Sequence, residues 1–308
     1  MKNQRVKVTS KMDAAIFMEN QLPVLDEAIL KSIDQFGHAQ PGQLKESMVY
    51  SLNTGGKRIR PMLLLATLKA LDADIQKGLN TAIALEYIHT YSLIHDDLPA
   101  MDNDDYRRGK PTNHKAFDEA TAILAGDSLL TDAFALVAND AKIESPQTKV
   151  NLIAELSKAA GSTGMIAGQI MDVNSEGKQV NLQSMQNIHK RKTGELIRYA
   201  VFAGGQIAEA SSEVAALLDD FAWTYGIAYQ IQNDLQEVMW TDDARGKLNH
   251  SDAELDKNTY PSIMGTNGAL TALSDKIESC KSILDQIQEI EPAFDVELLA
   301  GFLKYLKI

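Results

Sequence analysis

The chain has 308 residues, with 30 Lys+Arg against 42 Asp+Glu and a formal net charge of −12. This acidic balance argues against nucleic acid, or an anionic membrane, as the main partner. The single cysteine, Cys280, excludes an internal disulfide and a cysteine-based zinc site. The first residues lack the pattern of a signal peptide, and no apolar run approaches the ~20 residues of a membrane span. We therefore expect a soluble, cytoplasmic protein.

The whole chain, residues 1–308, is predicted to fold as a single all-α domain. Apolar residues recur at spacings of three and four almost throughout, whereas the strict alternation typical of half-buried strands is missing. No Ser/Gly/Pro-rich linker and no internal repeat divides it. In chain order, helices are expected over residues 12–36, 60–71, 77–98, 115–141, 147–160, 181–208, 212–239 and 267–290.

The segment GGKRIRP, residues 55–61, places Lys57, Arg58 and Arg60 after two glycines and at the start of a predicted helix. Pro61 suits the first turn of that helix. The helix dipole disfavours cations at this end by roughly a few tenths of a kcal/mol. The segment is therefore either a plain basic helix start or the edge of a site for an anion.

The helix expected over 79–98 is apolar nearly all round, which is typical of a helix in the middle of a bundle. Two adjacent carboxylates at the end of a buried helix are costly unless a cation neutralises them. Oxygen ligands without cysteine favour Mg²⁺ over zinc, and a solvated acidic loop is the alternative interpretation. Five carboxylates stand within ten residues here, namely Asp96, Asp97, Asp102, Asp104 and Asp105.

The spacing of Asp96 and Asp102 requires a break in this helix if both are to bind metal. In an unbroken helix the two would face roughly 240° apart. Pro99 must kink or stop the helix, and a distorted turn there can bring Asp102 back toward Asp96. Arg107 and Arg108 follow with guanidinium groups that suit phosphate oxygens. Carboxylates, Mg²⁺ and arginines together predict a diphosphate site.

At these residues the chain resembles a known family. DDLPAMD followed by RRGKPT looks like the first aspartate-rich motif of the trans-isoprenyl diphosphate synthases, or polyprenyl synthetases. Its two-residue expansion is similar to the bacterial farnesyl diphosphate synthase branch, and the likeness extends from about Met48 to Gly265. The resemblance implies the isoprenoid synthase fold, a helical bundle around a central cavity. It also implies a homodimer that uses up to three Mg²⁺ ions to join isopentenyl diphosphate to an allylic diphosphate.

The resemblance further implies roles that composition does not assign, since His89 alone would be a core residue and 189–197 a helix junction. The residues implied for isopentenyl diphosphate are Lys57, Arg60, His89 and Arg108. Those implied for the allylic diphosphate are Arg107, Lys192, Lys247 and Lys257. The carbonyls of Lys192 and Thr193, together with Gln230, would face the developing carbocation, and the released diphosphate would take the final proton.

The second metal motif departs from the family pattern. DDxxD is expected, whereas residues 233–237 read NDLQE. Gln230, Asn233, Asp234 and Glu237 lie at helical spacing and form one polar face. This is either an ordinary solvent-facing surface or, by resemblance, a metal-binding face opposite Asp96, Asp97 and Asp102. Asn233 offers a carbonyl oxygen without charge, so one Mg²⁺ is expected to bind more weakly.

Tyr91 and Ser92, shortly before Asp96, correspond by resemblance to the floor of the cavity for the growing tail. Tyr91 is large enough to stop the tail early, which predicts the C15 product, farnesyl diphosphate, rather than the longer geranylgeranyl chain. A class I terpene cyclase is a second interpretation, although it has no use for the basic segment 55–61. A third is a weakly active or regulatory family member, suggested by Asn233 and Gln236.

Overall fold

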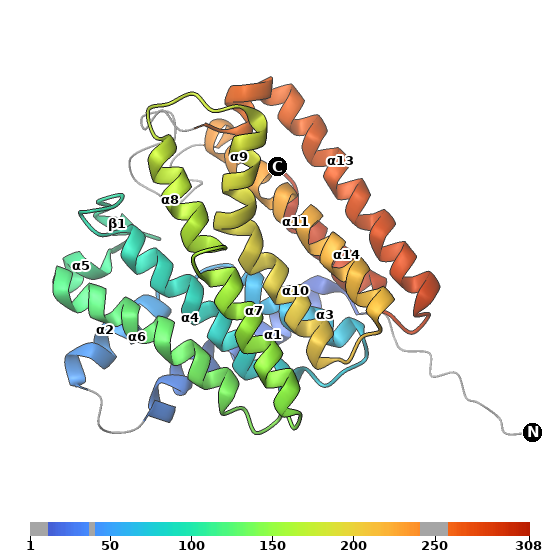
Figure 1. The fold of residues 1–308 in the computed structure, drawn as a ribbon, viewed down its shortest axis with the longest axis horizontal. Coiled ribbons are helices and arrows are strands. Elements are labelled where there is room, and N and C mark those ends of the chain that lie inside the picture. Colours follow the sequence, from blue (N-terminus) through green and yellow to red (C-terminus); the bar gives the residue numbers. More distant parts are fainter. Residues whose placement is uncertain (1–11, 37–40, 241–257) are drawn as a thin grey trace, which may run out of the picture.

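The computed structural model describes residues 12–36, 41–240 and 258–308, so the predicted ligands Lys247 and Lys257 lie outside the described residues. The described residues form an all-α bundle (Figure 1) with a short antiparallel pair, β1 (Tyr106–Arg107) and β2 (Lys110–Pro111). The predicted fold class is confirmed. The α-helices are α1 (Ala14–Ser32), α2 (Gly42–Leu52), α3 (Ile59–Ala70), α4 (Leu79–Asp96), α5 (Asn113–Ala116), α6 (Glu119–Ala138), α7 (Pro146–Ala160), α8 (Met165–Ser175), α9 (Leu182–His189), α10 (Glu195–Ile207), α11 (Ser212–Met239), α13 (Tyr260–Ile290) and α14 (Val296–Phe302).

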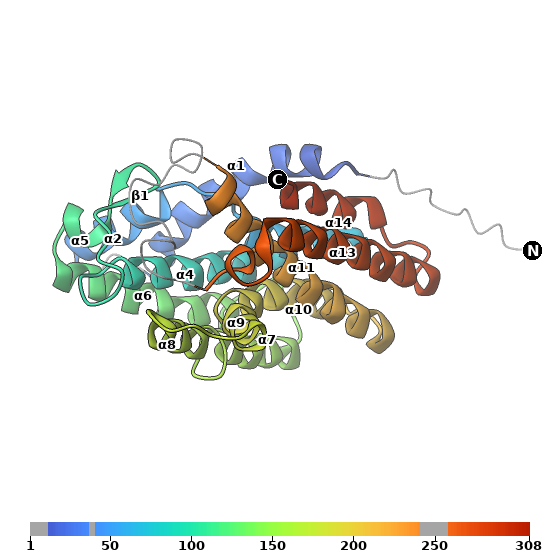
Figure 2. The same cartoon turned by 90° about the horizontal axis from the view of Figure 1, so that it is seen from above.

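Helix α4 lies inside the bundle, as its apolar surface predicts. Eleven of its residues between Thr81 and Ile94 are buried. It packs against α6 and α3, and α3 packs in turn against α10. In the view from above, α13 and α14 lie on the side of the molecule opposite α7 and α8 (Figure 2). The end of α4 is thereby held between two layers of helices, which is the position of the site described below.

Three helices, α2, α8 and α14, were not expected from the sequence, and α13 begins at Tyr260 instead of residue 267. The dipeptide Tyr260-Pro261 starts this helix, because Thr259 and Ser262 form a capping box and proline is favoured in a first helical turn. The helix expected over 181–208 is divided into α9, a π-helical turn at Lys190–Gly194, and α10.

Helix α6 is, within the described part of the chain, the one helix long and apolar enough to cross a membrane. Core helices of helical bundles have the same length and composition. Helix α6 packs on α4 and buries Ala122, Ala125 and Leu129, whereas Ile123 and Leu124 are exposed. Only part of the apolar surface of α6 is thus buried within this chain.

Candidate active site

The predicted break after Asp96 is present and brings the two metal-motif aspartates together. Helix α4 ends at Asp96, and the chain turns through Pro99. The backbone N–H of Asp102 then donates to the carbonyl oxygen of Asp96, with N and O 2.9 Å apart. Asn103 adopts a positive φ of 53° in this turn, a conformation that asparagine tolerates better than most residues. The turn thus returns Asp102 to the end of α4.

The Asp96 carboxylate suits a divalent cation. It accepts no hydrogen bond from the described residues, and it lines the main cavity. Burial raises its pKa to about 6, an effect that Lys192 opposes and Asp102 reinforces. A carboxylate that is partly desolvated and beside a second carboxylate is stabilised by Mg²⁺, which prefers oxygen ligands. Asp96 and Asp102 therefore fit the expected metal.

Asp97 is engaged differently. Its carboxylate is buried and accepts hydrogen bonds from Nε and Nη2 of Arg107, with Nη2 2.5 Å from Oδ1. Burial raises the pKa of Asp97, and the bond from Arg107 opposes this rise. The pair joins the end of α4 to β1. Asp97 and Arg107, predicted as a metal ligand and a diphosphate ligand, are thus brought together as partners of each other.

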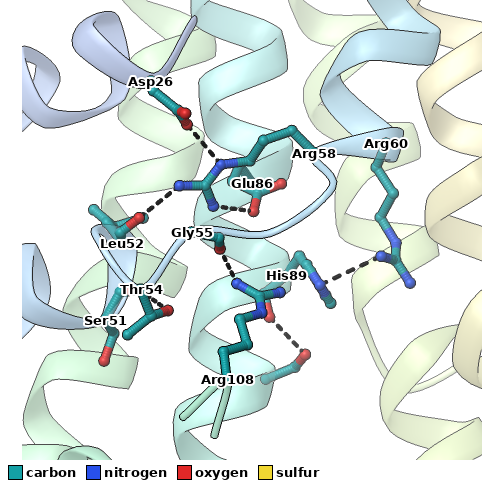
Figure 3. Close-up of polar contacts among 11 residues, drawn as sticks. Asp26, Ser51, Leu52, Thr54, Gly55, Arg58, Arg60, Glu86, His89 and Arg108 are labelled. Carbon is teal, nitrogen blue, oxygen red and sulfur yellow. Dashed lines mark hydrogen bonds and ion pairs between the residues drawn. The ribbon is translucent and has the colours of Figure 1, made fainter. Parts of the chain in front are cut away.

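Two of the four residues predicted to bind isopentenyl diphosphate are in direct contact. Arg60 Nη1 lies 3.3 Å from Nε2 of His89, and both side chains line the main cavity (Figure 3). Burial, followed by the charges of Arg60 and Arg108, lowers the pKa of His89 well below its usual value, so the ring is neutral. The buried Nε of Arg60 has no hydrogen-bond partner among the described residues. An unsatisfied guanidinium donor at a cavity wall suits an anion.

Arg108 and Lys57 flank this pair. Arg108 donates to the carbonyl oxygen of Gly55, and a Cβ at Gly56 would lie only 2.7 Å from the Arg108 guanidinium (Figure 3). Gly56 therefore has to be glycine for the arginine to lie against the loop. Lys57 is exposed at the same loop. The loop before α3 thus carries Lys57 and Arg60 and is contacted by Arg108, and of these three cations Arg60 lines the main cavity.

Lys192 and Thr193 lie in the π-helical turn and face the cavity from the side opposite α4. The Lys192 ammonium is 2.6 Å from a carboxylate oxygen of Asp172 on α8. Thr193 donates its hydroxyl proton to Oε1 of Gln230 at 3.1 Å. A π-helical turn leaves backbone carbonyls outside the usual i−4 pattern, and such turns are frequent at functional sites. Three residues predicted to act together are therefore assembled here.

The second motif is arranged less simply than its helical spacing predicted. Asp234 is buried and accepts hydrogen bonds from Gln230 Nε2 and from the backbone N–H of Tyr260, both at 2.9 Å. It therefore joins α11 to the start of α13. Asn233 and Glu237 are only partly buried on α11. No group of three or more His, Cys, Asp or Glu side chains within residues 12–36, 41–240 and 258–308 is close enough to hold an ion.

The main cavity has a volume of about 540 Å³. Its lining includes Asp96, Lys192 and the Arg60–His89 pair, and most of the lining surface is apolar. Tyr91 and Ser92 on α4 both line it, as predicted. Tyr91 is 5% exposed, and its hydroxyl has no hydrogen-bond partner among the described residues, so it presents an aromatic wall. A mostly apolar cavity with a few charged groups in its wall suits a molecule with a charged head and a hydrocarbon tail.

Helix α8 contributes residues to the site that the sequence analysis missed. Asp172 pairs with Lys192, and Ile166, Ile170 and Val173 line the apolar part of the cavity. The apolar spacing of i, i+4 and i+7 in this segment was the signal available. Gly168 lets α8 approach, because a Cβ there would lie 2.2 Å from the backbone nitrogen of Lys192.

Comparison with known proteins agrees with this geometry. A model of the family described as polyprenyl synthetase matches residues 41–293. The farnesyl diphosphate synthase of Geobacillus stearothermophilus is 46% identical over 267 residues, which is 86% of this chain and 89% of that protein. That of Bacillus subtilis (strain 168) is 43% identical over 280 residues, covering 90% and 92%. The crystal structure of geranyltransferase from Helicobacter pylori complexed with magnesium and isoprenyl diphosphate matches with a TM-score of 0.83 at 29% identity, covering 97% and 99%.

Proposed function

Because the chain belongs to the polyprenyl synthetase family, we propose that it is a Mg²⁺-dependent prenyltransferase that joins isopentenyl diphosphate head-to-tail to dimethylallyl or geranyl diphosphate. The main product is farnesyl diphosphate. One observation carries this function: a single, mostly apolar cavity is lined by Asp96, Lys192, the Arg60–His89 pair and Tyr91. The reaction requires groups that bind two diphosphates and an apolar space that holds the hydrocarbon tail.

Two groups of residues hold the two diphosphates apart. Arg60, Arg108 and Lys57 bind that of isopentenyl diphosphate, and neutral His89 supports them with a hydrogen bond to Arg60. Lys192 and, where it is released from Asp97, Arg107 bind the allylic diphosphate. Asp96 and Asp102 would hold Mg²⁺ with Asp97, Asn233, Asp234 and Glu237 as further candidates, in up to three sites. Bound Mg²⁺ would supply positive charge that favours departure of the allylic diphosphate.

The bond changes follow from this placement. The allylic C–O bond breaks, and its electron pair leaves with the diphosphate, whose growing charge Lys192 stabilises. The carbonyls at Lys192 and Thr193, with Gln230, face the allylic cation. The double bond of isopentenyl diphosphate attacks that cation, and loss of one proton to the released diphosphate restores the alkene. No side-chain base is required.

Asn233 separates this proposal from the regulatory alternative. Because Asn233 is neutral, the second motif would bind Mg²⁺ more weakly than a motif with aspartate at this position. The enzyme would then need a higher Mg²⁺ concentration for activity than one with the DDxxD motif. The intact first motif and the assembled basic residues support catalysis. The GGKRIRP segment and its contacts likewise support a two-substrate enzyme over a terpene cyclase, which takes one substrate.

The assembly and compartment are inferred on separate grounds. Exposed Ile123 and Leu124 on α6, 42% and 57% exposed, support a homodimer that covers this helix. The charge of −12 and the single buried cysteine support a cytoplasmic enzyme with no nucleic-acid partner.

The decisive experiment is turnover of labelled isopentenyl diphosphate with geranyl diphosphate across a series of Mg²⁺ concentrations. Mainly C15 product, formed only with the metal, is expected. A wild-type protein without turnover at any Mg²⁺ concentration would overturn the catalytic proposal. Mainly C20 or longer product would favour the geranylgeranyl alternative.

A further inference from the structure

The second cation of the GGKRIRP segment, Arg58, points away from the cavity into a buried ion cluster. We propose that Arg58 is a positioning residue for the isopentenyl diphosphate site: its cluster with Asp26 and Glu86 fixes the loop that carries Lys57 and Arg60. The inference rests on the proposed function, because it concerns how that site is held. Arg58 itself does not touch the substrate.

The Arg58 guanidinium joins three helices (Figure 3). Its Nε donates to Oδ1 of Asp26 on α1 at 2.8 Å, and Nη1 donates to Oε1 of Glu86 on α4 at 2.7 Å. Nη2 donates to the carbonyl oxygen of Leu52, the last residue of α2, at 2.6 Å. The side chains of Arg58 and Glu86 are each 3% exposed. Removing one member of such a pair leaves the other charge buried without its partner.

The backbone of Arg58 explains why its side chain and that of Arg60 go to different places. Arg58 precedes α3 in a left-handed conformation with φ 47° and ψ 31°. This conformation is unfavourable for a non-glycine residue, so other contacts must hold it. Figure 3 shows the Arg58 side chain directed to Asp26 and Glu86, with Arg60 beside His89 on the other side of the loop. The contacts of the Arg58 side chain with Asp26 and Glu86 therefore hold its backbone in the left-handed conformation.

The loop needs such an anchor for two reasons. Gly55 and Gly56 both have positive φ and give the chain more conformational freedom than other residues would. Arg60 and Arg108 are like charges that repel each other before an anion is bound. Glu86 lies one helical turn before His89 on α4, so the bond from Arg58 to Glu86 sets the loop relative to His89 as well.

A purely structural ion cluster makes a different prediction from a positioning one. Arg198 provides the matched comparison, because it is also a buried arginine that bridges helices. Its guanidinium lies 2.5 Å from Glu155 on α7 and 2.9 Å from Asp219 on α11, and it does not line the cavity. Loss of either arginine lowers stability. Only the loss of Arg58 displaces Lys57 and Arg60.

The experiment compares Arg58→Gln with Arg198→Gln in the full-length protein. KM is measured for isopentenyl diphosphate and for geranyl diphosphate, together with kcat and the midpoint of thermal unfolding. Arg58→Gln is expected to raise KM for isopentenyl diphosphate about tenfold and that for geranyl diphosphate less than about twofold. Arg58→Lys, which keeps the charge without the planar fork, should fall between wild type and Arg58→Gln. Arg198→Gln should lower the unfolding midpoint without separating the two KM values.

Equal changes in the two KM values for Arg58→Gln, or no change in either, would overturn the inference. If Arg58→Gln does not fold, Asp26→Asn decides in the same way, because it weakens one contact whose acid is 43% exposed. Calorimetric binding of isopentenyl diphosphate keeps this test separate from that of the proposed function. If the wild type binds isopentenyl diphosphate without turnover and Arg58→Gln does not bind it, the positioning role is supported while the proposed catalytic function is overturned.

Discussion

The Lys192 ammonium lies 2.6 Å from the Asp172 carboxylate across the cavity wall between the π-helical turn and α8. An ammonium group has three N–H donors, so Asp172 can fix its position and leave donors for a diphosphate. Asp172 on α8 thereby positions the Lys192 ammonium for the reaction, and Asp172 itself need not touch the substrate.

Lys192→Ala should therefore reduce kcat/KM for geranyl diphosphate by about 100-fold, since it removes the positive charge that stabilises the departing diphosphate. Asp172→Asn should give a smaller loss, about threefold to tenfold, because Lys192 stays but is less well oriented. Steady-state kinetics with each substrate varied in turn measure both. A larger loss in Asp172→Asn than in Lys192→Ala would show that Asp172 acts independently of the lysine.

Asp96 gives a prediction for stability without metal. Burial raises its pKa from 3.8 to about 6, so between these values the folded protein binds more protons at this site than the unfolded chain. The contribution of Asp96 to the free energy of unfolding therefore falls as pH rises from about 4 to about 6 and stays unfavourable above that range. In EDTA at pH 7.5, Asp96→Asn should unfold at a temperature equal to or above that of wild type while losing turnover. A clear decrease in its unfolding midpoint would contradict this.

The same pKa predicts how Mg²⁺ binding depends on pH. The cation binds the ionised carboxylate, so protons compete with it below about pH 6. The Mg²⁺ concentration for half-maximal activity should rise as pH falls from 7.5 to 5.5. Assays at saturating substrates measure it, and a requirement that is constant over this range would show that Asp96 is already ionised there.

Tyr91 lines the main cavity, and we propose that it limits the length of the product. Tyr91→Ala opens space beneath the tail, and mass spectrometry of extracted products should show C20 chains in place of part of the C15. Tyr91→Phe is the matched control, because it keeps the ring and removes only the unpaired hydroxyl; its products should remain C15. An unchanged C15 profile in Tyr91→Ala would place the limit at another residue.

Asn233→Asp restores a charge to the second motif. The Mg²⁺ concentration for half-maximal rate should fall about threefold to tenfold, because a carboxylate binds Mg²⁺ more strongly than an amide oxygen. Asn233→Ala, which removes the oxygen altogether, should change it in the opposite direction. Parallel Mg²⁺ titrations of the three proteins test this. A silent wild type beside an active Asn233→Asp would favour the regulatory alternative.

The sequence predicted the fold class and the turn between Asp96 and Asp102 well, because local signals determine both. The apolar surface of residues 79–96 predicts a central helix, and Pro99 predicts the turn that returns Asp102 to Asp96. The pairing of Asp97 with Arg107 and that of Asp172 with Lys192 depend on how separate elements pack. The spacing of residues along the sequence does not predict such contacts. Asp234 likewise fits its helical face in sequence, yet the start of α13 decides what it contacts.

The π-helical turn at Lys190–Gly194 accommodates one residue more than an α-helical turn. Deleting one residue there would let residues 182–207 close as a continuous α-helix with its backbone hydrogen bonds kept. The α9 and α10 segments would keep nearly the same relative rotation, because the π-helical turn takes up its extra residue locally, whereas the widened turn that carries Lys192 and Thr193 at the cavity would be lost. At this point the number of residues in the chain determines the local backbone geometry of the site, whereas the packing of the flanking helices does not depend on it.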